Sequence, residues 1–150
     1  MGKRKAEADD SGASALAAEL HALSGKLKRR LREQASAGDL TPSQTAVLSH
    51  LDRAGPTTVT ALARAEGVRP QSMGATVAVL EAAGMVQGAP DPNDGRQTIL
   101  SLTPACRELI KNGRAARHDW LFRNLQTKLT PQEQEQLAAA VKLLHHLLDP

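Results

Sequence analysis

The side chains with the clearest chemical potential lie in the segment DPNDGRQ, residues 91–97. Apolar residues stand on either side of it, up to Val86 and again from Ile99. Because Asp, Pro, Asn and Gly favour turns, the segment predicts the tip of a β-hairpin. The tip is longer than the roughly two to five residues of most hairpin loops, and Arg96 is its only cation. A guanidinium held out on a long turn is suited to an anionic partner.

A second group of candidate contact residues opens the helix expected over residues 70–83. A shorter helix is expected over residues 59–66, with Thr58 capping its start and Gly67 ending it in the left-handed conformation. Helix, short glycine-containing turn and helix form the helix-turn-helix pattern. In that motif the N-terminal residues of the second helix face the major groove of DNA. Arg69 and the free amides of the helix start would suit a phosphate.

The outward face of the 70–83 helix is small and uncharged. Met73, Val77 and Leu80 form its expected core stripe. The candidate DNA contacts in this region are Arg69, Pro70, Gln71, Ser72, Gly74, Ala75 and Thr76. Any two short helices around a glycine share this pattern, so it is weak on its own. The hairpin that follows directly is what makes it specific, because the combination is the winged-helix arrangement.

The Thr-Pro pairs at 41–42, 103–104 and 130–131 predict three further helix starts. Threonine can cap the orphan N–H groups of a helix, and proline at the first helical position lacks an N–H that would have no partner. Gln44 and Glu133 complete capping boxes with the threonines three residues before them. The expected order is therefore one long helix, three short helices, a hairpin and two further helices.

The helix expected over residues 13–36 carries its leucines in one stripe, at Leu16, Leu20, Leu23, Leu27 and Leu31. Its basic residues lie away from that stripe, at Lys26, Lys28, Arg29, Arg30 and Arg32. We interpret them as a solvated face; contact with a phosphate or an acidic partner is the alternative. Residues 1–12 are polar and aperiodic, and we expect them to form a flexible tail.

Composition narrows the class of protein. The 150 residues fit one domain with appendages, and the net charge of +3 permits a nucleic-acid partner without establishing one. No apolar run approaches the ~18 residues of a membrane span, and the N-terminus has no secretory pattern. The single cysteine, Cys106, is consistent with a reducing cytoplasm. Because catalytic and nucleotide-binding motifs are missing, we expect no enzyme activity, no metal and no cofactor.

Over residues 14–148 the chain resembles the MarR family of bacterial transcriptional regulators. The matching stretches are LTPSQTAVLSHL, TVTALARAEGV, RPQSMGATVAVLEAAGMV, DPNDGRQ and LSLTPA. The resemblance implies a mainly α fold with a small β-hairpin wing, a winged helix-turn-helix with N- and C-terminal dimerisation helices. The implied organisation is a tail at 1–12, a dimerisation helix at 13–36, a DNA-binding domain at 40–103 and dimerisation helices at 104–150.

The resemblance also implies a role for the hairpin tip. It implies that Arg96 enters the minor groove, where a narrow groove concentrates negative potential. Asp94 would brace the tip by hydrogen bonds or by pairing with an arginine, and Gly95 would supply a tight turn; Gln97 completes the candidate DNA contacts. The implied protein is a cytoplasmic homodimer that binds double-stranded DNA at a pseudo-palindromic operator, acts as a repressor and is released by a small-molecule effector. The effector and its binding residues are left open.

Two departures from the family pattern keep an alternative open. Gly74 and Ala75 stand where the family often has polar pairs that include arginine, and Gly95 stands where a second wing arginine is frequent. Losing a guanine-reading arginine could remove about 1–3 kcal/mol of base discrimination. The alternative is a winged-helix protein-interaction module that does not bind DNA. Cys106 lies in the first turn of a helix, where a redox role is conceivable, but we interpret it as a small buried residue.

Overall fold

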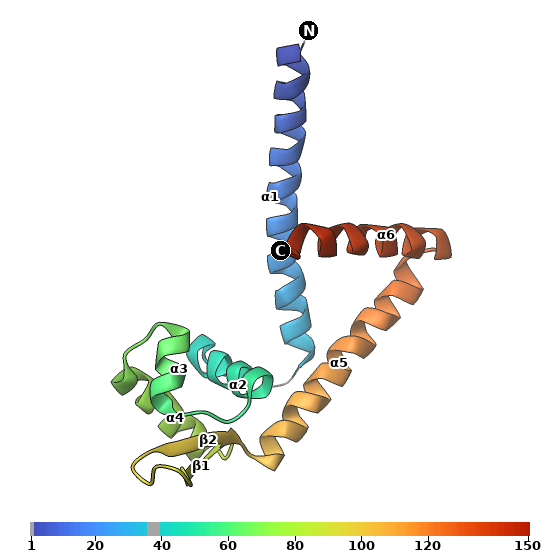
Figure 1. Cartoon of the computed structure of the whole chain (residues 1–150). Helices are drawn as coiled ribbons and strands as arrows, with labels where there is room; N and C mark the ends of the chain where they lie inside the picture. The colour runs from blue at the N-terminus through green and yellow to red at the C-terminus, as the bar shows by residue number, and fades with distance from the viewer. Residues whose placement is uncertain (1, 36–39) are drawn as a thin grey trace. The chain divides into compact units, whose positions relative to one another are not determined.

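The computed structural model describes residues 2–35 and 40–150, with side chains described from residue 10 on. Six helices and one antiparallel pair of strands make up these residues (Figure 1). The chain divides into two compact units, one formed by residues 37–113 and the other by residues 1–36 with 114–150. The elements are α1 (Gly2–Gln34), α2 (Pro42–Ala54), α3 (Val59–Glu66), α4 (Pro70–Ala82), β1 (Val86–Pro90), β2 (Thr98–Leu102), α5 (Pro104–Lys128) and α6 (Pro131–Leu148). The expected mainly α fold with a β-hairpin wing is confirmed.

The unit of residues 37–113 holds one hydrophobic core to which α2, α3, α4, both strands and the start of α5 contribute. Leu62, Leu80 and Leu100 are its largest side chains with less than 2% exposure. The stripe that the sequence predicted on α4 is confirmed, because its three members are all buried. The buried hydrophobic residues are Val47, Leu48, Leu51, Leu62, Ala63, Met73, Val77, Leu80, Val86, Leu100, Leu102 and Cys106.

The predicted helix starts are confirmed in detail. Thr41 and Thr130 each form a complete capping box: the backbone N–H of Gln44 donates to Thr41 Oγ1 at 3.2 Å, and that of Glu133 donates to Thr130 Oγ1 at the same distance. The hydroxyl of Thr103 accepts from the Cys106 N–H at 3.1 Å. Each cap satisfies a backbone donor that the helix itself leaves unpaired.

The helix-turn-helix is formed by α3, three turn residues and α4. Thr58 accepts a hydrogen bond from the Ala61 N–H at 3.1 Å and so starts α3. Gly67 ends α3 with φ 66°, the left-handed conformation that the sequence predicted. That conformation is costly for residues with a Cβ, so glycine is favoured at this turn.

The wing is a regular hairpin with a seven-residue connection. Val86 pairs with Leu102 and Pro90 with Thr98, so DPNDGRQ forms the tip as predicted. A third chain segment that the sequence did not indicate joins the sheet at Thr57. The Leu100 N–H donates to the Thr57 carbonyl at 2.7 Å, and the Thr57 N–H donates back to the Leu100 carbonyl at 3.1 Å. This bridge ties β2 to the segment just before α3.

The other unit contains α1, α6 and residues 114–128 of α5. We expected residues 1–12 to form a flexible tail; α1 as the structure describes it begins at Gly2 and so includes residues 2–12. Residues 2–10 contain no proline and no β-branched residue, and Lys, Arg, Ala and Glu have favourable helix propensities. These propensities favour a helix that extends beyond the leucine stripe. None of the described residues of α1 or α6 is buried in the single chain.

Glycine substitutions at two positions of the helix-turn-helix should change stability in opposite directions. Gly67→Ala should lower the free energy of unfolding by roughly 1 kcal/mol, because alanine must adopt a left-handed φ. Gly74→Ala should raise it by about 0.5–1 kcal/mol, because Gly74 lies inside α4 and an added Cβ there meets no atom within 4 Å. Urea unfolding followed by circular dichroism measures both. A change of the same sign in the two variants would contradict the described turn.

Candidate nucleic-acid interface

The start of α4 offers unsatisfied backbone donors. Arg69 is the N-cap residue, has an extended backbone and makes no side-chain hydrogen bond to the helix. Pro70 follows as the first helical residue and lacks an N–H, so Gln71 and Ser72 carry the exposed amides of this turn. The partial positive charge of a helix N-terminus favours an anion at this place. The guanidinium of Arg69, which is also exposed, adds a full charge beside it.

Most of the predicted contact residues on α4 are accessible. Arg69, Pro70, Gln71, Ser72 and Ala75 are exposed, whereas Gly74 and Thr76 are partly buried. The Thr76 hydroxyl donates to the Ser72 carbonyl at 3.2 Å. Its proton is therefore engaged within the helix, and Thr76 is less suited to donate to a base than its residue type alone indicated. This back-bonding is typical of threonine inside helices.

The tip of the wing is held by its own hydrogen bonds. The Asp94 carboxylate accepts from the Arg96 N–H at 3.1 Å, and the Asp91 carboxylate accepts from the Asn93 N–H at 2.9 Å. Backbone bonds from the Asp91 N–H to the Gln97 carbonyl and from the Gln97 N–H to the Asp94 carbonyl close the turn. Of the two predicted ways for Asp94 to brace the tip, hydrogen bonding is the one present.

The side chain of Arg96 extends from this braced turn into solvent, and Asp94, Gly95 and Gln97 are exposed as well. Arg96 forms no ion pair with another residue of the described ranges, so its five donors are available to a partner. Gly95 lies in the turn as predicted but does not have a positive φ. The backbone conformation therefore does not require glycine at position 95. The hydrogen bond from the Arg96 N–H to the Asp94 carboxylate tightens the turn instead.

One core positions both candidate contact regions. Met73, Val77 and Leu80 anchor α4 in it, and Val86 and Leu100 anchor the wing. α4 packs directly against β1 in this unit (Figure 1). The end of β2 is fixed to the turn after α4, since the Thr103 hydroxyl donates to the Gly84 carbonyl at 2.6 Å. The exposed face of α4 and the wing are therefore carried by the same core.

Sequence reasoning missed two of the supports behind this surface. The Thr57–Leu100 bridge has no local signal, because a single bridging residue shows no strand periodicity. The second is the close approach of His50 Nδ1 on α2 to Glu66 Oε1 at the end of α3, at 3.9 Å. Both side chains are partly shielded, and only the spatial approach of the two helices brings them together.

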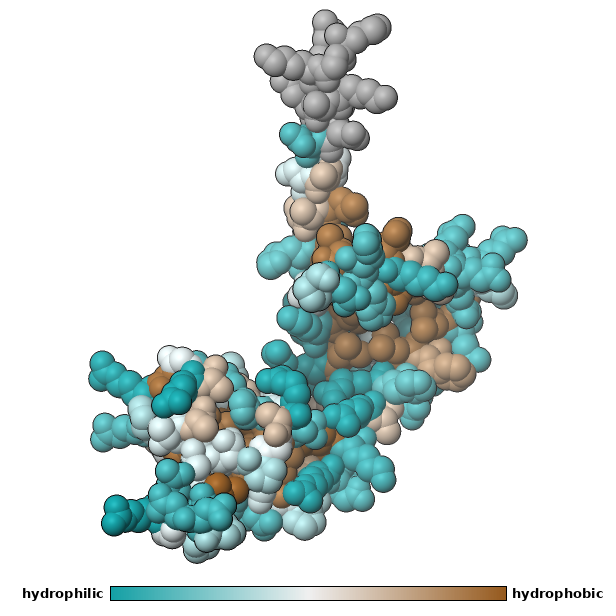
Figure 2. Space-filling view, in the orientation of Figure 1, coloured by the Kyte–Doolittle hydropathy of each residue, from teal (hydrophilic) through white to brown (hydrophobic). Residues whose placement is uncertain are grey.

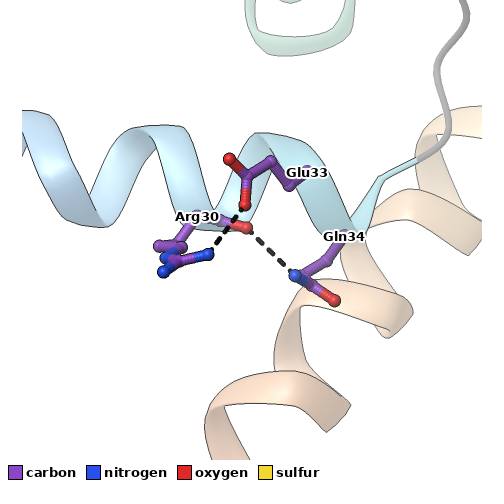
Figure 3. A network of polar contacts seen from close by, with 3 residues as sticks. All are labelled: Arg30, Glu33 and Gln34. Carbon is purple, nitrogen blue, oxygen red and sulfur yellow. Dashed lines mark hydrogen bonds and ion pairs between the residues drawn. The ribbon is translucent and has the colours of Figure 1, made fainter.

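The basic run on α1 does not form a second prepared site. Arg30 Nη1 lies 3.3 Å from Glu33 Oε2, and the Gln34 side chain donates to the Arg30 carbonyl (Figure 3). The Arg30 and Glu33 side chains are about half exposed, and exposed pairs of this kind contribute little to stability. These contacts agree with the interpretation of a solvated helix face.

Cys106 is a core residue. Its exposed fraction is 1%, and burial, followed by the nearby charge of Asp52, raises the pKa of its thiol. A protonated, enclosed thiol is a poor nucleophile, so the interpretation of Cys106 as a buried packing residue is confirmed. Within the described ranges no group of His, Cys, Asp or Glu residues could hold a metal ion.

A shallow cleft of about 220 Å³ lies in the same unit, between the end of α2, the Gly55–Pro56 turn, β2 and the start of α5. It is smaller than the ~300–1,000 Å³ of typical small-molecule pockets. Among residues 2–35 and 40–150, no helix combines the length and apolar composition needed to cross a bilayer.

Comparison with known proteins agrees with this architecture. The family model described as MarR family matches residues 38–97, from before α2 to the wing tip. The uncharacterized HTH-type transcriptional regulator Mb0904 of Mycobacterium bovis is 38% identical over 134 residues, covering 89% of this chain and 93% of that protein. The crystal structure of a transcriptional regulator protein from Pseudomonas aeruginosa PA01 is 36% identical, with a TM-score of 0.78 over 91% of this chain and 95% of its own.

A second similar structure is that of a mutant of MepR from S. aureus bound to an oligodeoxyribonucleotide. It covers 88% of this chain and 97% of its own with a TM-score of 0.69, and at 21% identity it shares the fold. The family match, the close relatives and the winged-helix geometry lead to one conclusion: this chain belongs to the MarR family of helix-turn-helix transcriptional regulators.

Proposed function

We propose that this protein is a repressor that binds a pseudo-palindromic DNA operator as a homodimer. The observation that carries the proposal is the pairing of two exposed contact regions on one core. The first turn of α4 presents free amides and Arg69, and the wing presents Arg96 on a tip braced by Asp94. A helix of this kind fits the major groove, and an arginine on an adjacent hairpin fits the minor groove.

This surface would make two kinds of contact with DNA, one to phosphates and one to bases. Arg69 and the α4 amides would hold phosphate oxygens and so fix the helix in the groove, without distinguishing sequences. Side chains on the outward face of α4 would meet base edges, and Arg96 would respond to the width and potential of the minor groove. A protein of the same fold, the MepR mutant from S. aureus, is bound to an oligodeoxyribonucleotide, which supports DNA as the class of ligand.

Dimerisation is proposed from the apolar surface of the other unit. Leu16 and Leu23 on α1 are 58% and 60% exposed, and Leu143 and Leu147 on α6 are 70% and 67% exposed. Apolar side chains gather over this part of the molecule (Figure 2). Contiguous exposed apolar surface is unfavourable in water and marks an interface, and a second copy would cover it. The two recognition helices would then lie about 34 Å apart, one turn of DNA.

Repression and its relief are part of the same proposal. A dimer seated on an operator that overlaps a promoter would exclude the transcription machinery from that DNA. A small-molecule effector would release it by binding more tightly to a conformation that cannot engage both half-sites. Such control needs no catalysis, cofactor or metal. We place the protein in the cytoplasm, where the DNA is, with one buried thiol and no disulfide.

A protein-interaction module is the second candidate, and one observation favours it: α4 carries no charged side chain between Pro70 and Leu80. The two candidates differ in how binding depends on salt, because only a phosphate interface releases condensed counterions. Purified protein should enrich a pseudo-palindromic sequence from fragments of the source genome at about 0.15 M salt, and its affinity for that sequence should fall steeply as salt rises. No enrichment at any salt concentration would favour the module.

Arg96→Ala should weaken binding to the selected operator by more than about 1 kcal/mol, or about fivefold in Kd, because it removes the wing contact. Arg96→Lys should recover only part of the loss, since lysine lacks the planar guanidinium. Lys128→Ala, which removes an exposed charge from α5, is the control and should change little. Fluorescence anisotropy measures the three affinities. Wild-type affinity in Arg96→Ala would rule out the wing contact.

The dimer is tested by sedimentation equilibrium at micromolar concentration, where the mass should be twice the 15.9 kDa of one chain. Leu147→Glu should shift the protein toward monomer, because it places a charge in the proposed apolar interface. His146→Glu adds the same carboxylate at an exposed position that is already polar, and should leave the dimer intact. A monomeric wild-type protein would refute the proposed assembly.

A further inference from the structure

We propose that Gln71 is the residue that determines base specificity, and that it reads adenine in a half-site whose major-groove centre consists of A·T pairs. This inference rests on the proposed function and specifies the DNA that the same surface would take. It follows from the position of Gln71 on α4 and from the chemistry of the side chains around it. The tests below separate its failure from failure of DNA binding itself.

The position comes from the helical repeat. Met73, Val77 and Leu80 are buried and define the inner face of α4. Residues at 3.6-residue spacing on the opposite face begin with Gln71 in the first turn, followed by Ala75 and Ala78. All three are exposed. Because the N-terminal part of a recognition helix lies deepest in the groove, the amide of Gln71 is placed where base edges are read.

No other side chain on the outward face of α4 is both as long as that of Gln71 and able to hydrogen-bond to a base. Its side chain makes no hydrogen bond to another described residue, so its amide donors and acceptor are free. The Thr76 hydroxyl is engaged with the Ser72 carbonyl, and Ser72 itself is short and lies on the flank. A glutamine amide can bond to N6 and N7 of adenine at once, which is its preferred pairing in the major groove.

The other side chains on the outward face of α4 itself, from Pro70 on, do not match G·C pairs. Guanine is read by arginine or lysine, and cytosine N4 is read by a carboxylate. α4 has no arginine, lysine or carboxylate before Glu81. The Glu81 carboxylate lies beside β1 of the wing, with Oε1 3.5 Å from the position that a Cβ on Gly88 would take. Ala75, Ala78 and the 54%-exposed Val79 are apolar, and apolar groups pack against the 5-methyl group of thymine. An amide followed by apolar side chains therefore matches A·T pairs.

The first test is a specificity switch. Random-sequence selection with the wild-type full chain should give half-sites centred on A·T pairs. Gln71→Glu, an isosteric change at an exposed position, should replace adenine by cytosine at one position of each half-site, because a carboxylate accepts from cytosine N4. Gln126→Glu on α5 adds the same charge elsewhere and should select the wild-type sequence.

The second test uses only the wild-type protein and modified DNA. Replacing the read adenine by 7-deazaadenine removes the N7 acceptor and should weaken binding about tenfold. Replacing each half-site thymine by uracil removes one methyl group and should cost about fourfold per methyl buried. Uracil in the flanking DNA under the wing is the control and should have little effect, because the minor groove lacks that methyl group.

The outcomes separate the two levels of the proposal. A·T-centred sites that lose affinity with 7-deazaadenine and uracil would support the assignment of Gln71. Selected sites with guanine at the centre, or sites unaffected by both modified bases, would overturn it while DNA binding stands. A wild-type protein that enriches no sequence would overturn the proposed function and this inference with it.

Discussion

Leu100 is the residue on which the arrangement of this DNA-binding unit depends most. Its side chain, 1% exposed, lies in the core with residues of α2, α3 and α4. Its backbone pairs with Gly88 of β1 on one side and exchanges two hydrogen bonds with Thr57 on the other. One residue therefore fixes the wing to the core and to the segment that leads into α3. Truncating a buried leucine costs roughly 2–5 kcal/mol, a large part of the ~5–15 kcal/mol that stabilises a typical domain.

This attachment explains how a chain with few basic residues near α4 can still present a defined contact surface. Arg96 lies at the tip of a hairpin whose strands are anchored by Val86 and Leu100, and Asp94 holds the turn by accepting from the Arg96 amide. The guanidinium keeps its own rotamer freedom, but its backbone is already positioned, which lowers the entropic cost of contact. α4 is held on the same core and needs no charge to keep its place. Affinity for DNA can then come from a few well-positioned groups, and base specificity from Gln71.

Much of the fold follows from local signals in the sequence. The Thr-Pro pairs marked three helix starts, Gly67 marked the turn of the helix-turn-helix, and the spacing of Met73, Val77 and Leu80 gave the buried face of α4. These features depend on neighbouring residues, so a linear pattern records them. The Thr57–Leu100 bridge and the His50–Glu66 pair depend on residues distant in the chain and left no such pattern. Residue type alone predicted a role for Thr76 and for Gly95, but the surrounding backbone determines what each does. The Thr76 hydroxyl bonds within α4, and Gly95 does not have a positive φ.

We infer that α4 and the wing tip form one DNA-binding surface. Amide hydrogen exchange of the full chain, with and without its selected DNA, tests this most directly because it reports each segment separately. We predict that DNA slows exchange in residues 70–79 and 91–97 together, and leaves residues 59–66 of α3 nearly unchanged. Protection confined to α1 and α6, or protection of α4 without the wing, would contradict the account.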